Sequence, residues 1–182
     1  ELEANRIELR AIGISNRGLI NAKETRIEGI SLSNLGGGRI YGDDLSLAAQ
    51  TLNNASENGV SPVIAARKRL DIGVTHLDNS DGALIYSEGD IVIGGHLDAN
   101  DHAAGQAASV TNRSATIEAA GNILVNADQV INKRSRFSVS QAMKEEGTEY
   151  AVHEFRPGGP WGLFSAAWVE KTQTVVDVDS GE

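Results

Sequence analysis

The sequence predicts an all-β fold, a parallel β-helix built from coils of about twenty residues. A short phrase that ends in Asn recurs six times along the chain, mostly at intervals near that length. Three of these phrases are followed within two to four residues by Gly and then a short segment that ends in Ile or Leu, namely Gly18-Leu-Ile, Gly38-Arg-Ile and Gly82-Ala-Leu. Between the phrases, apolar and polar residues alternate with a period of two, which is typical of strands with one buried face. Each repeat is therefore expected to contribute strand, turn and strand to a solenoid.

A leucine-rich repeat is the main alternative for a period of this length. It would require a longer Leu-x-x-Leu-x-Leu frame with a helical return, and the sequence lacks that frame. The apolar groups are also too short and too often interrupted by Gly for helices. In a parallel β-helix, like residues of successive coils lie over one another, so Ile over Ile and Leu over Leu should fill the interior.

The repeated Asn residues are predicted to form a structural turn ladder. They fall where a strand ends, and Asn suits such positions because it tolerates left-handed backbone and bonds nearby peptide groups. Stacked Asn side chains can also bond one another along a column. A ligand-binding or glycan-carrying role is the alternative for these residues. The predicted ladder consists of Asn16, Asn34, Asn54, Asn79, Asn112 and Asn132.

The Asn spacing stretches in two places, from Asn54 to Asn79 and from Asn79 to Asn112. Insertions in solenoids leave the coil as surface loops, so residues 58–66 and 99–108 are predicted to be loops. Asn100 is an alternative ladder position within the longer gap. The two loops are candidate places for function.

Composition excludes several functions. The net charge is −9, and the basic residues cluster only at 67–69 and 133–136, which argues against a nucleic-acid partner. Cysteine is absent, which excludes disulfides and thiolate metal sites. No apolar run approaches the roughly 20 residues that span a bilayer, so this segment is not expected to insert into a membrane.

The last fifty residues differ from the repeats. They hold six aromatic residues, whereas only Tyr41 and Tyr86 precede them. The predicted domains are therefore a β-helix at 1–132 and an aromatic-rich β extension at 133–182, a cap or a transition to another module. Within the extension we expect a hairpin that joins 137–142 to 149–155, and a further strand at 172–178.

Three aromatic residues of this extension are candidates for binding a partner, because Trp is enriched at interface hot spots. They could equally cap the open end of the β-helix, whose unpaired strand edge would otherwise invite aggregation. These residues are Trp161, Phe164 and Trp168.

An enzyme of the polysaccharide lyase or hydrolase type is a further alternative for a β-helix, because clustered carboxylates can perform acid and base steps. The same Asp residues suit ordinary turns, and no recurrent basic position accompanies them to hold a sugar carboxylate. The His residues share no metal-ligand spacing, so no catalytic residue, metal or cofactor is predicted. The residues weighed were Asp43, Asp44, Asp78, Asp81, Asp98, Asp101, His76, His96 and His102.

The repeat phrases at 14–22, 77–85 and 119–127 resemble filamentous haemagglutinin repeats. Such repeats belong to the large exoproteins of Gram-negative two-partner secretion systems, which include adhesins and effectors of contact-dependent growth inhibition. The resemblance covers residues 1–132, and the segment 131–140 with Glu149 and Tyr150 is similar to the one that often follows an Asn-rich coil in these exoproteins. It implies a right-handed β-helix within a long fibre.

The resemblance further implies a function, partners and a location. The chain would be a stalk segment that displays an adhesive, receptor-binding or toxin-delivering region on the outer-membrane surface. Its partners would be an outer-membrane transporter during export and a receptor on a host cell or a neighbouring bacterium. The chain shows neither the amino-terminal secretion motifs nor a carboxy-terminal toxin, so it is expected to be part of a longer protein. A polysaccharide-binding or polysaccharide-cleaving β-helix is the alternative function.

Overall fold

A computed structural model describes residues 1–134, 150–156 and 167–173. The chain divides into two units, Glu1–Phe137 and Ser138–Glu182, each considered by itself below. This division lies five residues beyond the boundary predicted after Asn132. The described residues form strands, turns and bends, with no helix among them, so the predicted all-β class is confirmed.

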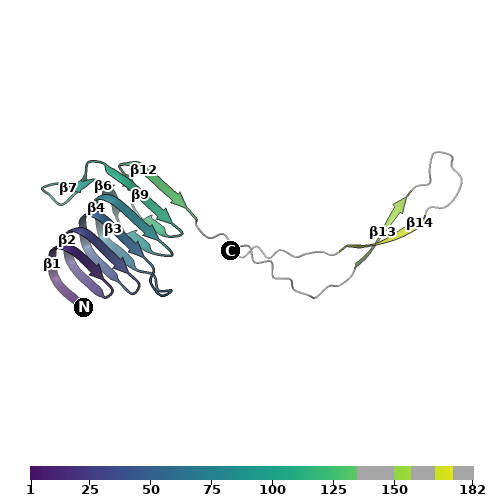
Figure 1. Ribbon diagram of the computed structural model, residues 1–182, viewed down its shortest axis with the longest axis horizontal. Coiled ribbons are helices and arrows are strands. Elements are labelled where there is room, and N and C mark those ends of the chain that lie inside the picture. Colours follow the sequence, from purple (N-terminus) through teal and green to yellow (C-terminus); the bar gives the residue numbers. More distant parts are fainter. Residues whose placement is uncertain (135–149, 157–166, 174–182) are drawn as a thin grey trace. The chain divides into compact units, whose positions relative to one another are not determined.

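The first unit is a solenoid of about six turns, as predicted (Figure 1). Four long strands each make most of one coil, and eight shorter strands make the last two coils and a small excursion from them. These strands are β1 (Leu2–Asn16), β2 (Leu19–Leu35), β3 (Arg39–Ala55), β4 (Val63–Ser80), β5 (Leu84–Ser87), β6 (Asp90–Gly94), β7 (His96–Leu97), β8 (Ala103–Ala104), β9 (Ala107–Arg113), β10 (Thr116–Ala119), β11 (Ile123–Val125) and β12 (Ala127–Lys133).

Every coil pairs in parallel with the coil before it. Strands β1, β2, β3 and β4 pair in that order, and three segments of β4, at 63–66, 69–73 and 76–80, pair with β5, β6 and β9. The sixth coil continues the same pattern, because β10, β11 and β12 pair with β5, β6 and β9. Each complete coil therefore has a first, a second and a third strand segment. The predicted parallel β-helix is confirmed.

The core consists of aliphatic columns that run along the stack. In each column, buried aliphatic residues of successive coils occupy paired positions. The expected Ile-over-Ile packing is confirmed in the first column and Leu-over-Leu in most of the third, whereas the second column mixes Ile and Leu. Residues that lie in one layer of the hydrogen-bonded stack are roughly 4.8 Å from the next layer, so these side chains are in continuous contact. The first-segment column is Ile20, Ile40, Ile64 and Ile85; the second is Ile27, Leu47, Ile72 and Ile93; the third is Leu32, Leu52, Leu77 and Val110.

The prediction of a loop at 58–66 was wrong in its second half. Residues from Val63 belong to β4, and the Ile64 side chain is fully buried in the first-segment column. The loop occupies 56–62, where Glu57 and Val60 form an isolated bridge. The few residues that follow Pro62 are too short a segment to predict a strand from alternation alone. The strand forms there because Ile64 packs into the first-segment column.

The second insertion is also shifted from its predicted range. In the fourth coil, His76 follows Gly73 by three residues. Their register partners in the fifth coil, Gly94 and Ser109, are fifteen residues apart, so the insertion lies between them. Ala107 is already back in the stack and fully buried, so the loop spans 95–106 rather than 99–108. Within this loop, β7 and β8 pair in antiparallel fashion.

The second unit contains an antiparallel pair, β13 (Tyr150–Arg156) with β14 (Ala167–Gln173). A strand near 149–155 was predicted, but its partner in the described residues is β14, because alternation alone does not identify which strand pairs with which. The predicted partner 137–142 and most of the predicted strand 172–178 lie outside the described residues. Trp168 lies in β14 opposite Phe155, while Trp161 and Phe164 are outside the described residues.

The aliphatic columns should dominate the stability of the solenoid. We expect Leu47→Ala, which empties a fully buried position, to lower the free energy of unfolding by about 2–5 kcal/mol. Guanidinium unfolding followed by circular dichroism measures this change. The control is Ile12→Ala at a position that is 80% exposed, where a change within about 0.5 kcal/mol is expected. Equal losses for both variants would contradict the column as the source of stability.

Candidate functional site

The six predicted ladder residues form one column along the solenoid, buried or partly buried except at Asn132. Each of the first five donates an Nδ2 hydrogen bond to the Oδ1 of the next Asn. The five distances, in chain order from Asn16 to Asn132, are 2.9, 2.9, 2.8, 2.9 and 3.0 Å. The column therefore crosses all six coils without a break.

In the first five ladder residues, Nδ2 also donates to a backbone carbonyl. Asn34 donates to the Val63 carbonyl at 3.1 Å, and Asn54 donates to the Leu84 carbonyl at 3.1 Å. A carbonyl only accepts, so the NH2 group must face it and Oδ1 must face the preceding coil. All five ladder bonds consequently point the same way along the rod, and bonds aligned in a chain polarise one another.

Hydrogen bonding, and not backbone conformation, explains why these positions are Asn. Asn34, Asn54 and Asn79 are fully buried within strands, and none of the six ladder residues has a positive φ. The ladder residues lie at strand ends, as predicted, but left-handed backbone is not the reason for Asn, because the left-handed residues, such as Asp81 and Ser114, belong to the turns that follow. Buried amides whose donors and acceptor all have partners in the chain have no group left for a ligand or a glycan.

The Gly that follows a ladder residue has a packing role at one position. A Cβ added to Gly38 would collide with Oδ1 of Asn34. The turn after β2 therefore approaches the ladder closely enough to require glycine. The longest Asn interval is a single coil, because Asn79 bonds Asn112 directly, so Asn100 does not stand in the column.

The ladder can be tested by removing one rung. We expect Asn54→Leu to lower the free energy of unfolding by about 2 kcal/mol or more, because it leaves buried groups of Asn34, Asn79 and Leu84 without a partner. Asn53→Ala is the matched control, since Asn53 precedes this rung and points to the opposite side of the same strand. Asn132→Ala should cost less than Asn54→Leu, because the last rung is exposed. If the ladder did not contribute to stability, all three variants would unfold at the same midpoint concentration of guanidinium.

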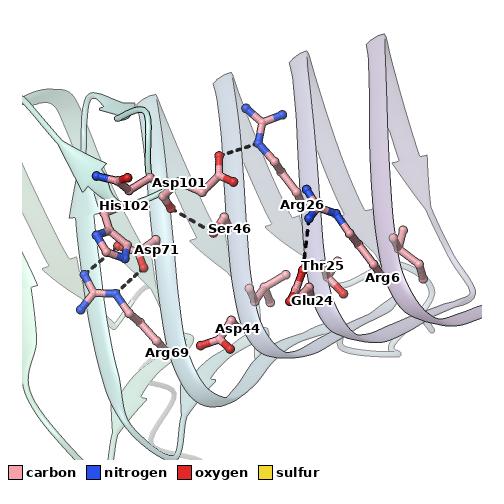
Figure 2. A pocket seen from close by; sticks show the side chains of 13 residues that line it. Arg6, Glu24, Thr25, Arg26, Asp44, Ser46, Arg69, Asp71, Asp101 and His102 are labelled. Atoms are coloured by element: carbon pink, nitrogen blue, oxygen red, sulfur yellow. Dashed lines mark hydrogen bonds and ion pairs between the residues drawn. The ribbon is translucent and has the colours of Figure 1, made fainter.

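A polar groove lies on the outer face of the second strand segments, beneath the 95–106 loop (Figure 2). Its volume is about 270 Å³. Four coils and the loop contribute to its walls, so residues far apart in the sequence meet there. The charged and His residues that line it are Arg6, Glu24, Arg26, Asp44, Arg69, Asp71, Asp101 and His102.

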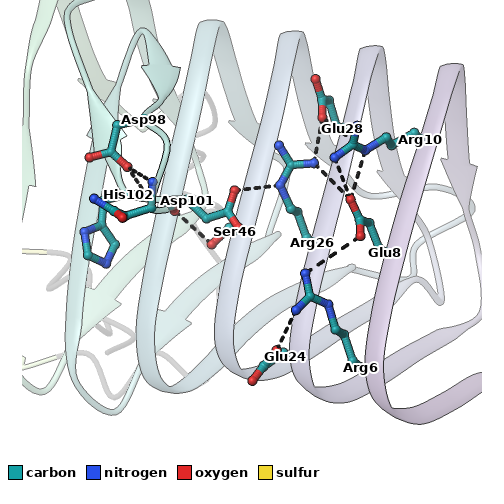
Figure 3. Close-up of polar contacts among 11 residues, drawn as sticks. Arg6, Glu8, Arg10, Glu24, Arg26, Glu28, Ser46, Asp98, Asp101 and His102 are labelled. Atoms are coloured by element: carbon teal, nitrogen blue, oxygen red, sulfur yellow. Dashed lines mark hydrogen bonds and ion pairs between the residues drawn. The ribbon is translucent and has the colours of Figure 1, made fainter.

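Arg26 holds the loop to the second coil. Its Nε donates to Asp101 at 2.6 Å, and its NH1 donates to Glu28 at 2.6 Å and lies 3.6 Å from Glu8 (Figure 3). The Arg26 pKa is raised, first by the hydrogen bond to Asp101. Ser46 of the third coil donates to the Asp101 carbonyl at 3.0 Å, so one loop residue is attached to two coils.

Asp71 attaches the loop to the fourth coil. Its carboxylate, which is only 3% exposed, accepts from Arg69 at 2.5 and 3.0 Å and from the Ala103 amide at 2.8 Å. The hydrogen bond to Asp71 is the first cause of the raised Arg69 pKa. The two ion pairs, Arg26 with Asp101 and Arg69 with Asp71, neutralise charges of which only Asp101 was a candidate from the sequence. Only the register of the stacked coils brings them together.

Glycine allows the loop to lie close to the stack. A Cβ on Gly73 would collide with the backbone at His96, and Cβ atoms on Gly94 and Gly95 would collide with the backbone at Ala104 and Gln106. The Gly94-Gly95 pair is thus a sequence signal for the start of the insertion that the repeat spacing did not reveal.

Three of the nine candidate acid and His residues, Asp44, Asp101 and His102, line the polar groove. The other candidates are dispersed. Asp43 contacts Arg67 and Lys68, whereas Asp78 pairs with Arg113 at 2.7 Å. His76 bonds Ser109, Asp98 holds the loop turn, Asp81 lies in a turn, and His96 packs beside Gly105. Across the described ranges there is no group of three or more His, Cys, Asp or Glu side chains that could hold a metal ion. The arrangement provides structural ion pairs and a polar groove.

Comparison with known proteins found no matching family model, no matching curated protein and no matching solved structure. Nothing in the described part of the chain is a helix long and apolar enough to cross a membrane. The molecule is thus defined by its fold and its surface, as a parallel β-solenoid with an internal Asn ladder and one loop fastened across its outer face.

The loop turn should respond to acid. Asp98 accepts from the amides of Asn100 at 2.8 Å and His102 at 3.0 Å, and these bonds, His102 first, lower its pKa from the ordinary 3.8. The turn contacts are therefore complete above pH 3.8 and are lost as the pH falls through the lower pKa of the folded state. We expect the amide proton shifts of both residues in NMR to titrate with a midpoint below 3.8.

Asp98→Asn is the matched control for this titration. The amide side chain keeps an oxygen acceptor for both backbone donors but has no carboxylate to protonate. Its spectrum should lose the acid step. A midpoint in the wild type at or above 3.8 would show that the two amides do not stabilise the carboxylate.

Proposed function

We propose that this chain is a segment of the shaft of a large exoprotein of the filamentous haemagglutinin type on the surface of a Gram-negative bacterium. The shaft displays an adhesive, receptor-binding or toxin-delivering region away from the producing cell. The Asn ladder within in-register coils is the observation that carries this proposal. Repeat phrases that resemble those of such exoproteins support it.

A shaft requires a cross-section that can be repeated without limit. Each coil here bonds the coil before and after it, and a solenoid of this kind grows in length while its local contacts stay the same. The ladder adds a continuous row of buried side-chain bonds along the axis. Bending the rod would stretch both sets of bonds, so the architecture suits a stiff spacer.

The composition suits export of an unfolded chain through an outer-membrane transporter. With no cysteine, disulfides cannot form before or during passage. A coil that has emerged presents a free strand edge onto which the next coil pairs, so folding can propagate along the chain. The proposed partners are the two-partner transporter during export and, through the parent protein, a receptor on a host cell or a neighbouring bacterium.

Surface display should depend on that transporter. An epitope tag can be inserted between Asn58 and Gly59, an exposed turn in which both residues have positive φ and a Cβ on Gly59 would meet no atom within 4 Å. In the full-length parent protein, we expect antibody to label intact cells that carry the transporter and only permeabilised cells that lack it. Labelling that is independent of the transporter, or a tag that stays inside when the transporter is present, would refute the proposal.

Two deletions provide matched controls within the same experiment. Removing residues 35–54 takes out one whole 20-residue period and keeps an Asn in register with Asn79. A shaft should tolerate this loss, so transporter-dependent surface display should persist. Removing residues 35–44 breaks the register and should abolish display. Loss of display in both deletions would contradict a shaft built from repeatable coils.

A further inference from the structure

The outer face of the first strand segments carries both aromatic residues that precede Phe137. Tyr41 and Tyr86 belong to one register column, in which Tyr41 pairs with Ala65 and Ala65 pairs with Tyr86. Two layers of a hydrogen-bonded stack separate their backbones by roughly 10 Å. Ala65 fills the intervening layer with a single methyl group, so a gap remains between the two rings.

This gap is part of a shallow pocket with a volume of about 290 Å³. Val63 and Leu84 form an apolar floor beside it, in neighbouring positions of the adjacent column. The column continues into Asn21 on one side and Glu118 on the other, so the apolar stretch is bounded at both ends. A small apolar pocket with few polar groups around it is the usual form of a ligand site.

The rim of the pocket has little free positive charge. Arg67 donates to Asp43 at 3.2 Å and to Asn21 at 3.1 Å, and Lys68 lies 3.4 Å from Asp43. Glu88 also lines the rim and has no ion pair among residues 1–134. An anionic ligand would meet this carboxylate, and the one cation that lines the pocket, Arg67, is already paired with Asp43, so the pocket suits an uncharged ligand.

The same surface excludes strand addition by a peptide. A peptide that extends a sheet needs a free edge, whereas β3 and β5 each have a neighbour on both sides. Only side chains are available on this face. The bounded apolar area is also far smaller than the face that a stable protein dimer buries.

We propose that this pocket binds one or two sugar residues of an uncharged hexopyranose glycan. The C–H face of a pyranose ring is apolar and packs against the Tyr41 and Tyr86 rings above Ala65. The hydroxyls of the sugar can form hydrogen bonds at the rim, where the tyrosine hydroxyls, the Arg67 guanidinium and the Glu88 carboxylate supply donors and acceptors. This function goes beyond that of a shaft, because the shaft itself would attach to a glycan.

The test uses the full chain and an array of neutral hexose and N-acetylhexosamine oligosaccharides, followed by calorimetry on each glycan that binds. We expect binding of at least one neutral glycan, with saturation transfer to its ring C–H protons in NMR. Tyr41→Ala and Tyr86→Ala should each weaken binding about tenfold or more. Tyr86→Phe should retain most of the affinity, and Asn53→Ala, on the outer face of the third segment, is the control for a distant change.

Three results would overturn the proposal. The array could show no neutral glycan bound, or the two Tyr→Ala variants could bind as the wild type does. Sedimentation could instead show a concentration-dependent dimer that Tyr86→Ala abolishes, which would assign this face to a second copy of the chain. Circular dichroism of each variant verifies that the partly exposed substitutions leave the solenoid folded. The shaft proposal is tested separately by transporter-dependent display, so either proposal can fail alone.

Discussion

The solenoid depends on one constraint, which is that each coil must place the same kind of side chain over its counterpart in the coils above and below. Parallel backbone hydrogen bonds between layers impose it, because a slip of one residue would exchange the buried and exposed faces of a strand. The chain meets the constraint in six coils whose Asn intervals run from 18 to 33 residues. It does so by placing the differences in length at turns, at loops and at one register shift between β3 and β4, after Gly42, while the residues on either side of each stay paired.

Two kinds of interior column follow from this constraint. Aliphatic residues fill most of the interior, where Ile and Leu in successive layers exclude water. The Asn column brings polar groups into the same interior, and it is tolerated because every buried amide has partners in the next coil and in the backbone. Removing one Asn should therefore destabilise the fold, because a buried amide without a partner costs more free energy than a paired amide contributes. The ladder is thus part of the scaffold.

Outward positions are free of the constraint and differ between the faces. On the second segments, stacked charges form ion pairs that fasten the 95–106 loop across several coils. On the first segments, the Tyr41–Ala65–Tyr86 column leaves a bounded apolar pocket. A solenoid with a uniform interior can therefore carry different surfaces along one axis, as the proposed shaft and the proposed glycan pocket both require.

The sequence by itself determined the period, the class and the content of the columns. Alternation at period two and the recurring Asn were sufficient, because a stack repeats the same local pattern in every layer. It did not determine why Asn is required, since the ladder bonds join residues 18–33 positions apart and the left-handed positions fall elsewhere. The limits of both insertions were misplaced, because Ile64 and Ala107 are strand residues only by virtue of the columns they enter. Tertiary structure alone decided which charges meet in the groove and that two distant tyrosines share a face, because register between coils is a long-range property that local sequence does not encode.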